Sequence, residues 1–162
     1  IMFKYLRSNI FINLLTILLI FILDRAAKMY VLNGNFDGLK NQFVITNYLN
    51  LELVWNQGVA FGLLSMDDNN LYNLLTLLIT TIIIIILFIS FKSKGSKKIA
   101  FLMIAGGALG NLYDRIIYKK VPDFIDFHIG EFHWFIFNIA DIFITLGVIF
   151  MIIIEFIEPN KK

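Results

Sequence analysis

The chain has 162 residues, of which 59% are hydrophobic without counting glycine and 16% are charged. Soluble domains reach about 45–50% hydrophobic with glycine included and about 25% charged, so the composition excludes a typical soluble protein and indicates helices embedded in a membrane. The net charge of +2 is too small to indicate nucleic-acid binding, and the lack of cysteine excludes disulfides, thiol nucleophiles and cysteine-based metal sites.

Four apolar segments are long enough to cross the hydrocarbon core, which takes about 20 helical residues. We predict spans over residues 10–32, 71–91, 99–118 and 134–157, within a single integral membrane domain of residues 1–162. The first apolar run, residues 10–23, also has the length of a signal-peptide core, but Asp24 and Arg25 directly after it suit cleavage poorly.

Basic residues predict the orientation of these spans. The connection 92–98 carries four lysines and no acid, both ends of the chain are basic, and the long connection 33–70 carries Lys40 against four acids. Because cytoplasmic loops are enriched in lysine and arginine, we expect both termini and the connection 92–98 to be cytoplasmic. The connections 33–70 and 119–133 then face outward, with Lys119 and Lys120 as a local exception.

The outer segment 36–64 contains stretches in which apolar and polar residues alternate, with high strand propensity between residues 43 and 55. This alternation is typical of a strand with one buried face. The sequence therefore predicts an all-α membrane protein with four transmembrane helices and a small extracytoplasmic β-sheet on the outer membrane surface.

Polar residues inside the third span are unusual for their position. Ionisable side chains near the bilayer centre cost roughly 2.5–3.5 kcal/mol on insertion scales, so they usually serve a site. Asn111 and Asp114 share a helix face with Gly107 and Gly110. A helix-packing face, including the GxxxG of Gly106 and Gly110, explains the glycines but not the asparagine and the aspartate.

The fourth span repeats this feature, with Asn138 and Asp141 on one helix face. We expect Asp141 about two turns into a span that begins at Trp134. A purely structural carboxyl at that depth would need a partner such as Asn111 or Arg115, so a functional role is favoured.

Further acids lie between these spans, where Pro122 is expected to end the helix and fix the approach to Asp123. Asp123 and Asp126, taken singly, are best interpreted as solvated loop acids. With Asp141 nearby, Asp123 becomes a candidate for one half of a carboxyl pair, although spacing alone ranks Asp114 equally. Two close carboxyls share one proton and can hydrolyse an amide by acid–base catalysis.

Two weaker signals lie nearer the N-terminus. Asp24 and Lys28 form an i,i+4 pair, which is at least as typical of a helix-stabilising ion pair as of a site. Asn56 and Gly58 suit a turn after the predicted sheet.

His128 and His133 fall on an outer loop. With no cysteine and only two histidines, we expect no metal site there and no cofactor. A Ser–His–Asp site is equally disfavoured, since Ser65 has no surrounding nucleophile motif.

Five motifs occur in order along the chain and together resemble those of bacterial lipoprotein signal peptidase, also called signal peptidase II. They are Asp24-x-x-x-Lys28, Asn56-x-Gly-Val-Ala-Phe61, Gly106-Gly-Ala-Leu-Gly-Asn-x-x-Asp-Arg115, Val121-x-Asp-Phe124 and Phe137-Asn-x-Ala-Asp141. The resemblance implies an aspartic endopeptidase of the bacterial plasma membrane with its active site near the extracytoplasmic face, and we expect it to be a monomer. Its implied partners are membrane lipids and diacylglyceryl-modified prolipoproteins, whose signal peptide it would remove by cleaving just before the lipidated cysteine.

The resemblance also assigns roles to residues, with Asp123 and Asp141 as the catalytic pair. Substrate-binding or pair-supporting roles are implied for Asn56, Gly58, Asn111, Asp114, Arg115, Asn138, Ala140, Asp24 and Lys28. Ala27 departs from the family, which commonly has serine or threonine there. The main alternative is a small transporter or channel with carboxylates on a proton or ion path. The four predicted spans show no inverted repeat, which argues against this alternative.

Overall fold

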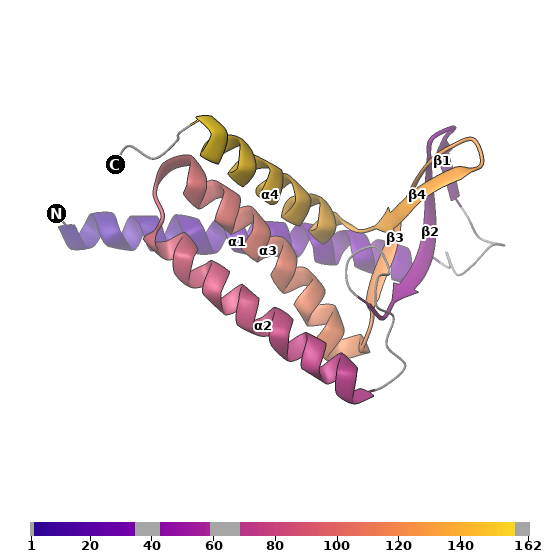
Figure 1. Cartoon of the computed structure of the whole chain (residues 1–162), viewed down its shortest axis with the longest axis horizontal. Helices are drawn as coiled ribbons and strands as arrows, with labels where there is room; N and C mark the ends of the chain where they lie inside the picture. Colours follow the sequence, from indigo (N-terminus) through magenta and orange to yellow (C-terminus); the bar gives the residue numbers. More distant parts are fainter. Residues whose placement is uncertain (1, 35–42, 59–68, 158–162) are drawn as a thin grey trace.

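The computed structural model describes residues 2–34, 43–58 and 69–157. In these residues it contains four helices and four strands: α1 (Met2–Asn33), β1 (Phe43–Thr46), β2 (Leu49–Asn56), α2 (Asn69–Lys92), α3 (Gly95–Tyr118), β3 (Val121–Ile129), β4 (Phe132–Phe137) and α4 (Ile139–Ile157). The helices lie side by side and the strands form a small sheet at one end of the bundle (Figure 1). The mostly helical architecture with a small sheet is confirmed.

Helix α3 is the centre of the bundle and contacts α1, α2 and α4. The start of α1 and the end of α4 lie at the same end of the bundle, opposite the sheet (Figure 1). Helix α1 contacts β2 and β3, and helix α3 contacts β3.

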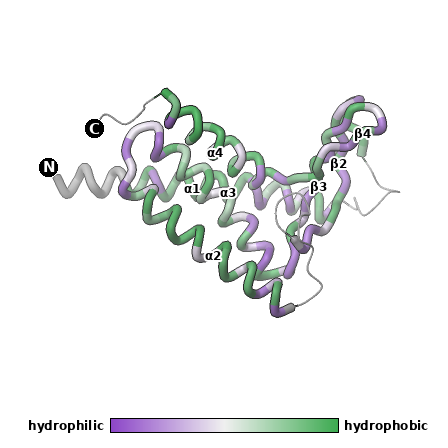
Figure 2. The backbone as a smooth tube through the Cα atoms, in the orientation of Figure 1, coloured by the Kyte–Doolittle hydropathy of each residue, from purple (hydrophilic) through white to green (hydrophobic). Residues whose placement is uncertain are grey.

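Three helices of the described chain are long and apolar enough to cross a membrane, with candidate spans Ile10–Asn33, Asn70–Lys92 and Ile139–Ile157. Figure 2 shows the apolar residues along these helices and the polar residues gathered near the sheet. Helix α3 is less apolar because its second half carries glycines together with Asn111, Asp114 and Arg115. Its neighbours bury much of this half, so α3 has less apolar surface than a helix that faces lipid on most sides.

Glycines let α3 approach the helices on both sides. A Cβ atom on Gly106 would lie 2.9 Å from the Cβ of Ile20 in α1, and one on Gly107 would lie 2.5 Å from the backbone oxygen of Ala140 in α4. Gly147 of α4 faces Ile104 of α3 in the same way. Small residues at these crossings bring polar groups of α1, α3 and α4 within hydrogen-bonding distance.

The four strands of the described chain form one antiparallel sheet in the order β1-β2-β3-β4. Strand β3 pairs with β2, placing Asp123 opposite Val54, and with β4, placing His128 opposite His133. The prediction of strands in the segment 36–64 is confirmed for β1 and β2, while the rest of that segment lies outside the described residues. The interpretation of 119–133 as a loop is wrong, since most of it forms β3 and the start of β4.

The predicted fourth span begins too early. Residues 134–137 belong to β4, and α4 begins at Ile139. Asp141 therefore lies in the first turn of α4 and not two turns inside it. A continuous apolar run does not reveal where a strand ends and a helix begins, and here the polar side chain of Asn138 marks that point.

Candidate active site

Four charged side chains link α1 to α3. The guanidinium of Arg25 donates to both carboxylate oxygens of Asp114, at 2.6 and 2.7 Å, and Lys28 Nζ lies 2.6 Å from Asp114 Oδ2. Asp24 Oδ2 completes the group at 2.9 Å from Arg25 and 3.0 Å from Lys28. Two acids and two bases balance each other, so charges that would be costly alone are buried as a neutral cluster.

Arg25 is a residue of this cluster that was not predicted as a site residue. Asp24 and Lys28, predicted as an i,i+4 pair and, from the family resemblance, as supporting residues, are both fully buried. A second cation three residues before Lys28, in a segment with one acid, is a signal that another acid must come from elsewhere in the chain. Asp114 is that acid.

Asp24 also fixes the beginning of α4. Its Oδ1 accepts a hydrogen bond from the backbone N–H of Ala140 at 3.0 Å, which satisfies one of the free N–H groups of the first turn. Gly110 allows this contact, because a Cβ there would lie 2.6 Å from Asp24 Oδ2. Ala140 is completely buried at this crossing, and its role is therefore to let α1, α3 and α4 meet.

A relay of hydrogen bonds leads from the charged cluster to Asp141. Lys28 Nζ donates to Asn111 Oδ1 at 2.8 Å, and Asn111 Nδ2 donates to Asp141 Oδ1 at 2.8 Å. Because the ammonium group has only donors, it fixes the amide of Asn111 with its oxygen toward Lys28 and its NH₂ toward Asp141. The lysine thus orients a carboxylate that it does not itself contact in this arrangement.

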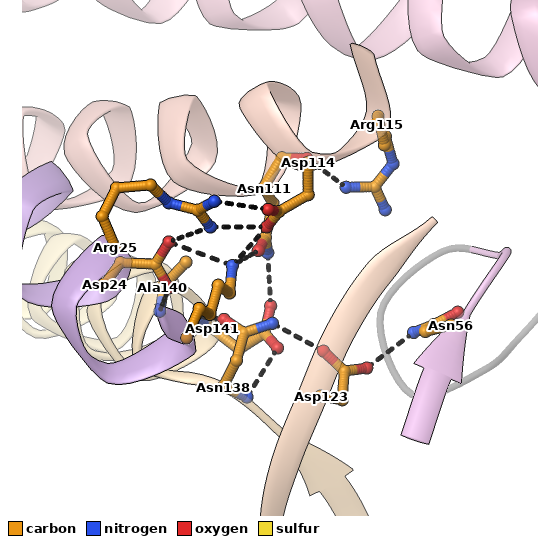
Figure 3. A network of polar contacts seen from close by, with 11 residues as sticks. Asp24, Arg25, Asn56, Asn111, Asp114, Arg115, Asp123, Asn138, Ala140 and Asp141 are labelled. Carbon is orange, nitrogen blue, oxygen red and sulfur yellow. Dashed lines mark hydrogen bonds and ion pairs between the residues drawn. The ribbon is translucent and has the colours of Figure 1, made fainter. Parts of the chain in front are cut away.

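Asn138 connects Asp141 to Asp123. The backbone N–H of Asn138 donates to Asp141 Oδ2, and the backbone N–H of Asp141 donates to Asn138 Oδ1, both at 3.1 Å. This reciprocal pair is a capping box at the start of α4. The remaining donor of Asn138, Nδ2, reaches Asp123 Oδ1 at 2.6 Å. One asparagine therefore touches both carboxyl groups (Figure 3).

The second oxygen of Asp123 is held by the sheet. Asn56 Nδ2 donates to Asp123 Oδ2 at 2.9 Å, and the oxygen of the Asn56 amide accepts from the backbone N–H of Gly58 at 2.8 Å. Gly58 thereby sets which way the Asn56 amide points, as the expected turn would require.

Asp123 and Asp141 both line a cavity of about 390 Å³. Figure 3 shows the two side chains reaching toward each other, one from β3 and one from α4. Burial and the nearby charge of Asp141 together raise the pKa of Asp123 to about 7, although the N–H donors of Asn56 and Asn138 oppose both effects. The remaining cavity residues are Asn56, Ile79, Ala108, Asn111, Arg115, Val121, Ile144, Thr145, Val148 and Ile149.

Arg115 also lines this cavity, but its contacts differ from those expected. It donates to backbone oxygens, at 3.2 Å to Asn111 and 3.0 Å to Gly58, and within the described chain it forms no ion pair with a carboxylate. Its Nε is buried without a hydrogen-bond partner among the described residues. Arg115 therefore joins α3 to the segment after β2 and brings positive charge to the cavity wall.

The structure separates the candidate acids that the sequence left equal. Asp114 does not line the cavity, and both of its oxygens are bonded to Arg25 or Lys28. The interpretation of Asp126 as a solvated loop acid is wrong, because Asp126 is completely buried and bonds to His133 at 2.9 Å. Neither residue shares the cavity with Asp141.

A helical fold with a cavity that contains two carboxyl groups is typical of a membrane-embedded hydrolase of the aspartic type. The chain belongs to the signal peptidase II family: the family model described as signal peptidase (SPase) II matches residues 16–157. The resemblance found in the five sequence motifs is confirmed.

Similar proteins agree with this assignment. The chain is 49% identical over 155 residues to a lipoprotein signal peptidase of Pelagibacter ubique (strain HTCC1062), covering 96% of this chain and 93% of that protein. It is 37% identical to a lipoprotein signal peptidase of Anaplasma phagocytophilum (strain HZ), covering 93% and 94%. A solved bacterial membrane enzyme is similar with a TM-score of 0.75 at 30% identity, covering 93% of this chain and 90% of that one.

Proposed function

We propose that Asp123 and Asp141 are the catalytic pair with which this member of the signal peptidase II family removes signal peptides from prolipoproteins. The observation that carries the proposal is the shared asparagine: Asn138 bonds to both carboxyl groups where they face one cavity. Membership of the signal peptidase II family and relatives named lipoprotein signal peptidase support the same activity. They leave the transporter alternative without support.

The surroundings of the two carboxyls suggest different roles for them. Asp141 accepts N–H donors from Asn111 and Asn138 and lies at the N-terminus of a helix, where the helix dipole favours a negative charge. Asp123, whose pKa is raised to about 7, carries the shared proton near neutrality. Asp141 thus acts as the base and Asp123 as the acid.

The reaction then follows in two proton transfers. Asp141 takes a proton from a water molecule, which attacks the scissile carbonyl, while Asp123 donates its proton to the carbonyl oxygen. In the collapse of the tetrahedral intermediate, the proton on Asp141 passes to the leaving amine and Asp123 recovers its own. Two carboxyls suffice for this cycle, so we propose no catalytic metal and no cofactor.

The cavity wall suits a substrate that arrives within a membrane. Ile144, Val148 and Ile149 of α4 line the same cavity as the two carboxyl groups. An apolar signal-peptide segment can contact these side chains while its scissile bond reaches the two carboxyls. We propose cleavage just before a diacylglyceryl-modified cysteine, as the family resemblance implies.

The same proposal includes the position of the enzyme in the membrane. All four helices cross the bacterial plasma membrane, with both termini cytoplasmic and the sheet on the outer surface, so that the pair lies near the extracytoplasmic face. The apolar surfaces of the helices and the lysines of residues 92–98, at the end opposite the sheet, support this orientation. The protein acts as a monomer surrounded by lipid.

The test is cleavage of a synthetic prolipoprotein by the purified protein in detergent. We expect release of the signal peptide from the diacylglyceryl-modified substrate and little release from the same peptide without lipid. Asp114→Asn serves as a matched comparison for Asp123→Asn, because both remove one buried carboxylate. A wild-type protein that folds, binds this substrate and does not cleave it would contradict the proposal.

A further inference from the structure

Asp126, His128 and His133 form a second cluster of titratable side chains on β3 and β4, and none of them lines the cavity of the catalytic pair. His133 Nδ1 lies 2.9 Å from Asp126 Oδ2, and His128 Nδ1 lies 3.6 Å from the same oxygen. All three potential ligand atoms lie within 4.8 Å of one another. The sequence contains two histidines, and both belong to this cluster.

A β-bulge creates this convergence. Asp126 pairs with Ile136, so a regular register would place Trp134 opposite His128, but the register shifts between Asp126 and His128 and His133 takes that position. A bulge of this kind re-aims a side chain at a cost in regular pairing. The two imidazoles consequently face each other across β3 and β4, with ring centroids 5.0 Å apart.

The separations fit the coordination sphere of a small transition metal. Zinc binds nitrogen and oxygen at about 2.0–2.1 Å in a tetrahedron, which places neighbouring ligand atoms about 3.3 Å apart. The distances of 2.9 and 3.6 Å lie on either side of this value. The rings are nearly parallel, at 20°, so one ring must turn to direct its lone pair inward; the side chain of His133 is 49% exposed and has room to do so.

Asn50 of β2 supplies a second, independent observation. Asn50 is 5% exposed, and its Oδ1 is buried without a hydrogen-bond partner among the described residues. Its Nδ2 makes only long contacts of 3.4 Å to Asp126 and His128. A half-turn of the amide would direct the unsatisfied oxygen into the cluster as a fourth oxygen or nitrogen donor.

In contrast to the expectation from the sequence, we propose that Asp126, His128 and His133 bind a divalent transition metal ion, with zinc the best match and with Asn50 Oδ1 or water as the fourth ligand. Two imidazoles and one carboxylate favour zinc, copper or nickel over calcium or magnesium, which prefer oxygen ligands. The ion would join β2, β3 and β4 three residues from Asp123 on β3. Its role is to hold the sheet, and it takes no part in cleavage.

Cobalt(II) is a suitable probe, because it occupies tetrahedral zinc sites and then absorbs visible light. The full chain, purified without a polyhistidine tag, should bind one Co²⁺ with a tetrahedral absorption band that added Zn²⁺ abolishes. His133→Gln should reduce the affinity at least tenfold. Glu131→Gln, which removes an exposed acid from the turn between the same strands, should leave the affinity unchanged. Absence of the band, or equal affinity in His133→Gln, would overturn the proposal.

Stability and cleavage give the remaining tests. Zn²⁺ should raise the melting temperature of the wild type and of Glu131→Gln, but not of the double variant His128→Gln, His133→Gln. A zinc-induced rise that persists in the double variant would show that the ion binds elsewhere and would refute the site. Removal of metal by a chelator should leave cleavage of lipidated substrate unchanged; its loss would overturn the structural role of the ion. Binding is measured without substrate, so this result does not depend on the proposed peptidase function.

Discussion

Asn138 and Asp141 hydrogen-bond to each other in both directions: each backbone N–H donates to the side chain of the other, at 3.1 Å in both cases. This reciprocal cap begins α4 and fixes the side chain of Asp141 at the same time. It also leaves the NH₂ group of Asn138 free for one further bond, which goes to Asp123. The local rule that starts a helix thus sets the relative position of the two carboxyls.

Asn138→Ala should therefore reduce cleavage strongly while the protein still folds and inserts. The variant loses the N-cap, which costs about 1 kcal/mol of stability, and it loses the donor to Asp123. The turnover rate of lipidated substrate and the melting temperature in detergent measure the two losses. Unchanged turnover would remove Asn138 from the site.

Asn138→Ser separates these two effects. Serine is as good an N-cap as asparagine, but its hydroxyl is too short to cap α4 and reach Asp123 together. We expect a melting temperature near that of the wild type and turnover as low as in Asn138→Ala. If the serine variant is as active as the wild type, the bond between Asn138 and Asp123 has no catalytic role.

Asp123→Asn and Asp141→Asn should each reduce cleavage by a factor of roughly 10² or more, because an amide of the same size cannot take up a proton. The double variant should be little worse than either single one, since the two carboxyls act as a unit. Single-turnover rates with bound substrate measure this directly. A folded but inactive Asp114→Asn beside an active Asp123→Asn would place the pair at Asp114 and Asp141 instead.

Asn56→Ala should move the alkaline limb of the pH–rate profile to higher pH. Asp123 must be protonated to act as the acid, so activity falls as the pH rises above its pKa of about 7. The donor of Asn56 stabilises the ionised form and lowers this pKa, so its removal raises the pKa. Asn50→Ala, an asparagine of the same strand that faces Asp126, is the control and should leave the limb in place. A shift to lower pH, or equal shifts in both variants, would contradict the role of Asn56.

Gly107→Ala should be more damaging than Gly106→Ala. The added Cβ of Gly107→Ala meets the backbone oxygen of Ala140 at 2.5 Å, whereas that of Gly106→Ala meets the Cβ of Ile20 at 2.9 Å, a less severe overlap. Overpacking of this kind typically costs about 1–3 kcal/mol. Melting temperatures of the two variants check the order, and equal values would show that α3 and α4 can move apart without loss.

A reporter fused after the last residue should read as cytoplasmic. The lysines of residues 92–98 and the basic ends of the chain motivate this expectation. An alkaline phosphatase fusion, active only outside, and a fluorescent protein fusion, active only inside, give opposite signals. An extracytoplasmic reading would contradict the proposed topology.

The helices were predictable from the sequence because long apolar runs dominate it. The residue at which α4 begins was not predictable. Residues 134–137 are as apolar as the helix that follows, so hydrophobicity alone cannot place the boundary. The strand pairing of β3 depends on β2, which lies far away in the sequence. The alternation expected of a strand is weak in β3, since most of its first six residues are buried on both faces.

Candidate site residues could be named from spacing and family motifs, but their partners could not. Asp114 and Asp123 looked equivalent in the sequence. The cations that pair with Asp114 are Arg25 and Lys28, which lie 89 and 86 residues away from it. Asp126 looked solvated because the register shift that brings His133 to it is a property of the paired strands. Long-range pairs of this kind follow from the fold and not from local composition.

The bond between Asp24 and Ala140 joins residues 116 positions apart, at the end of the first helix and the beginning of the last. During synthesis, Asp123 leaves the ribosome before α4, so a partly made chain contains one carboxyl of the pair and none of the contacts that α4 provides. If Asp123 and Asp141 are the proposed catalytic pair, proteolytic competence arises only when the final helix packs against α1. We therefore expect truncated products of interrupted translation to be inactive.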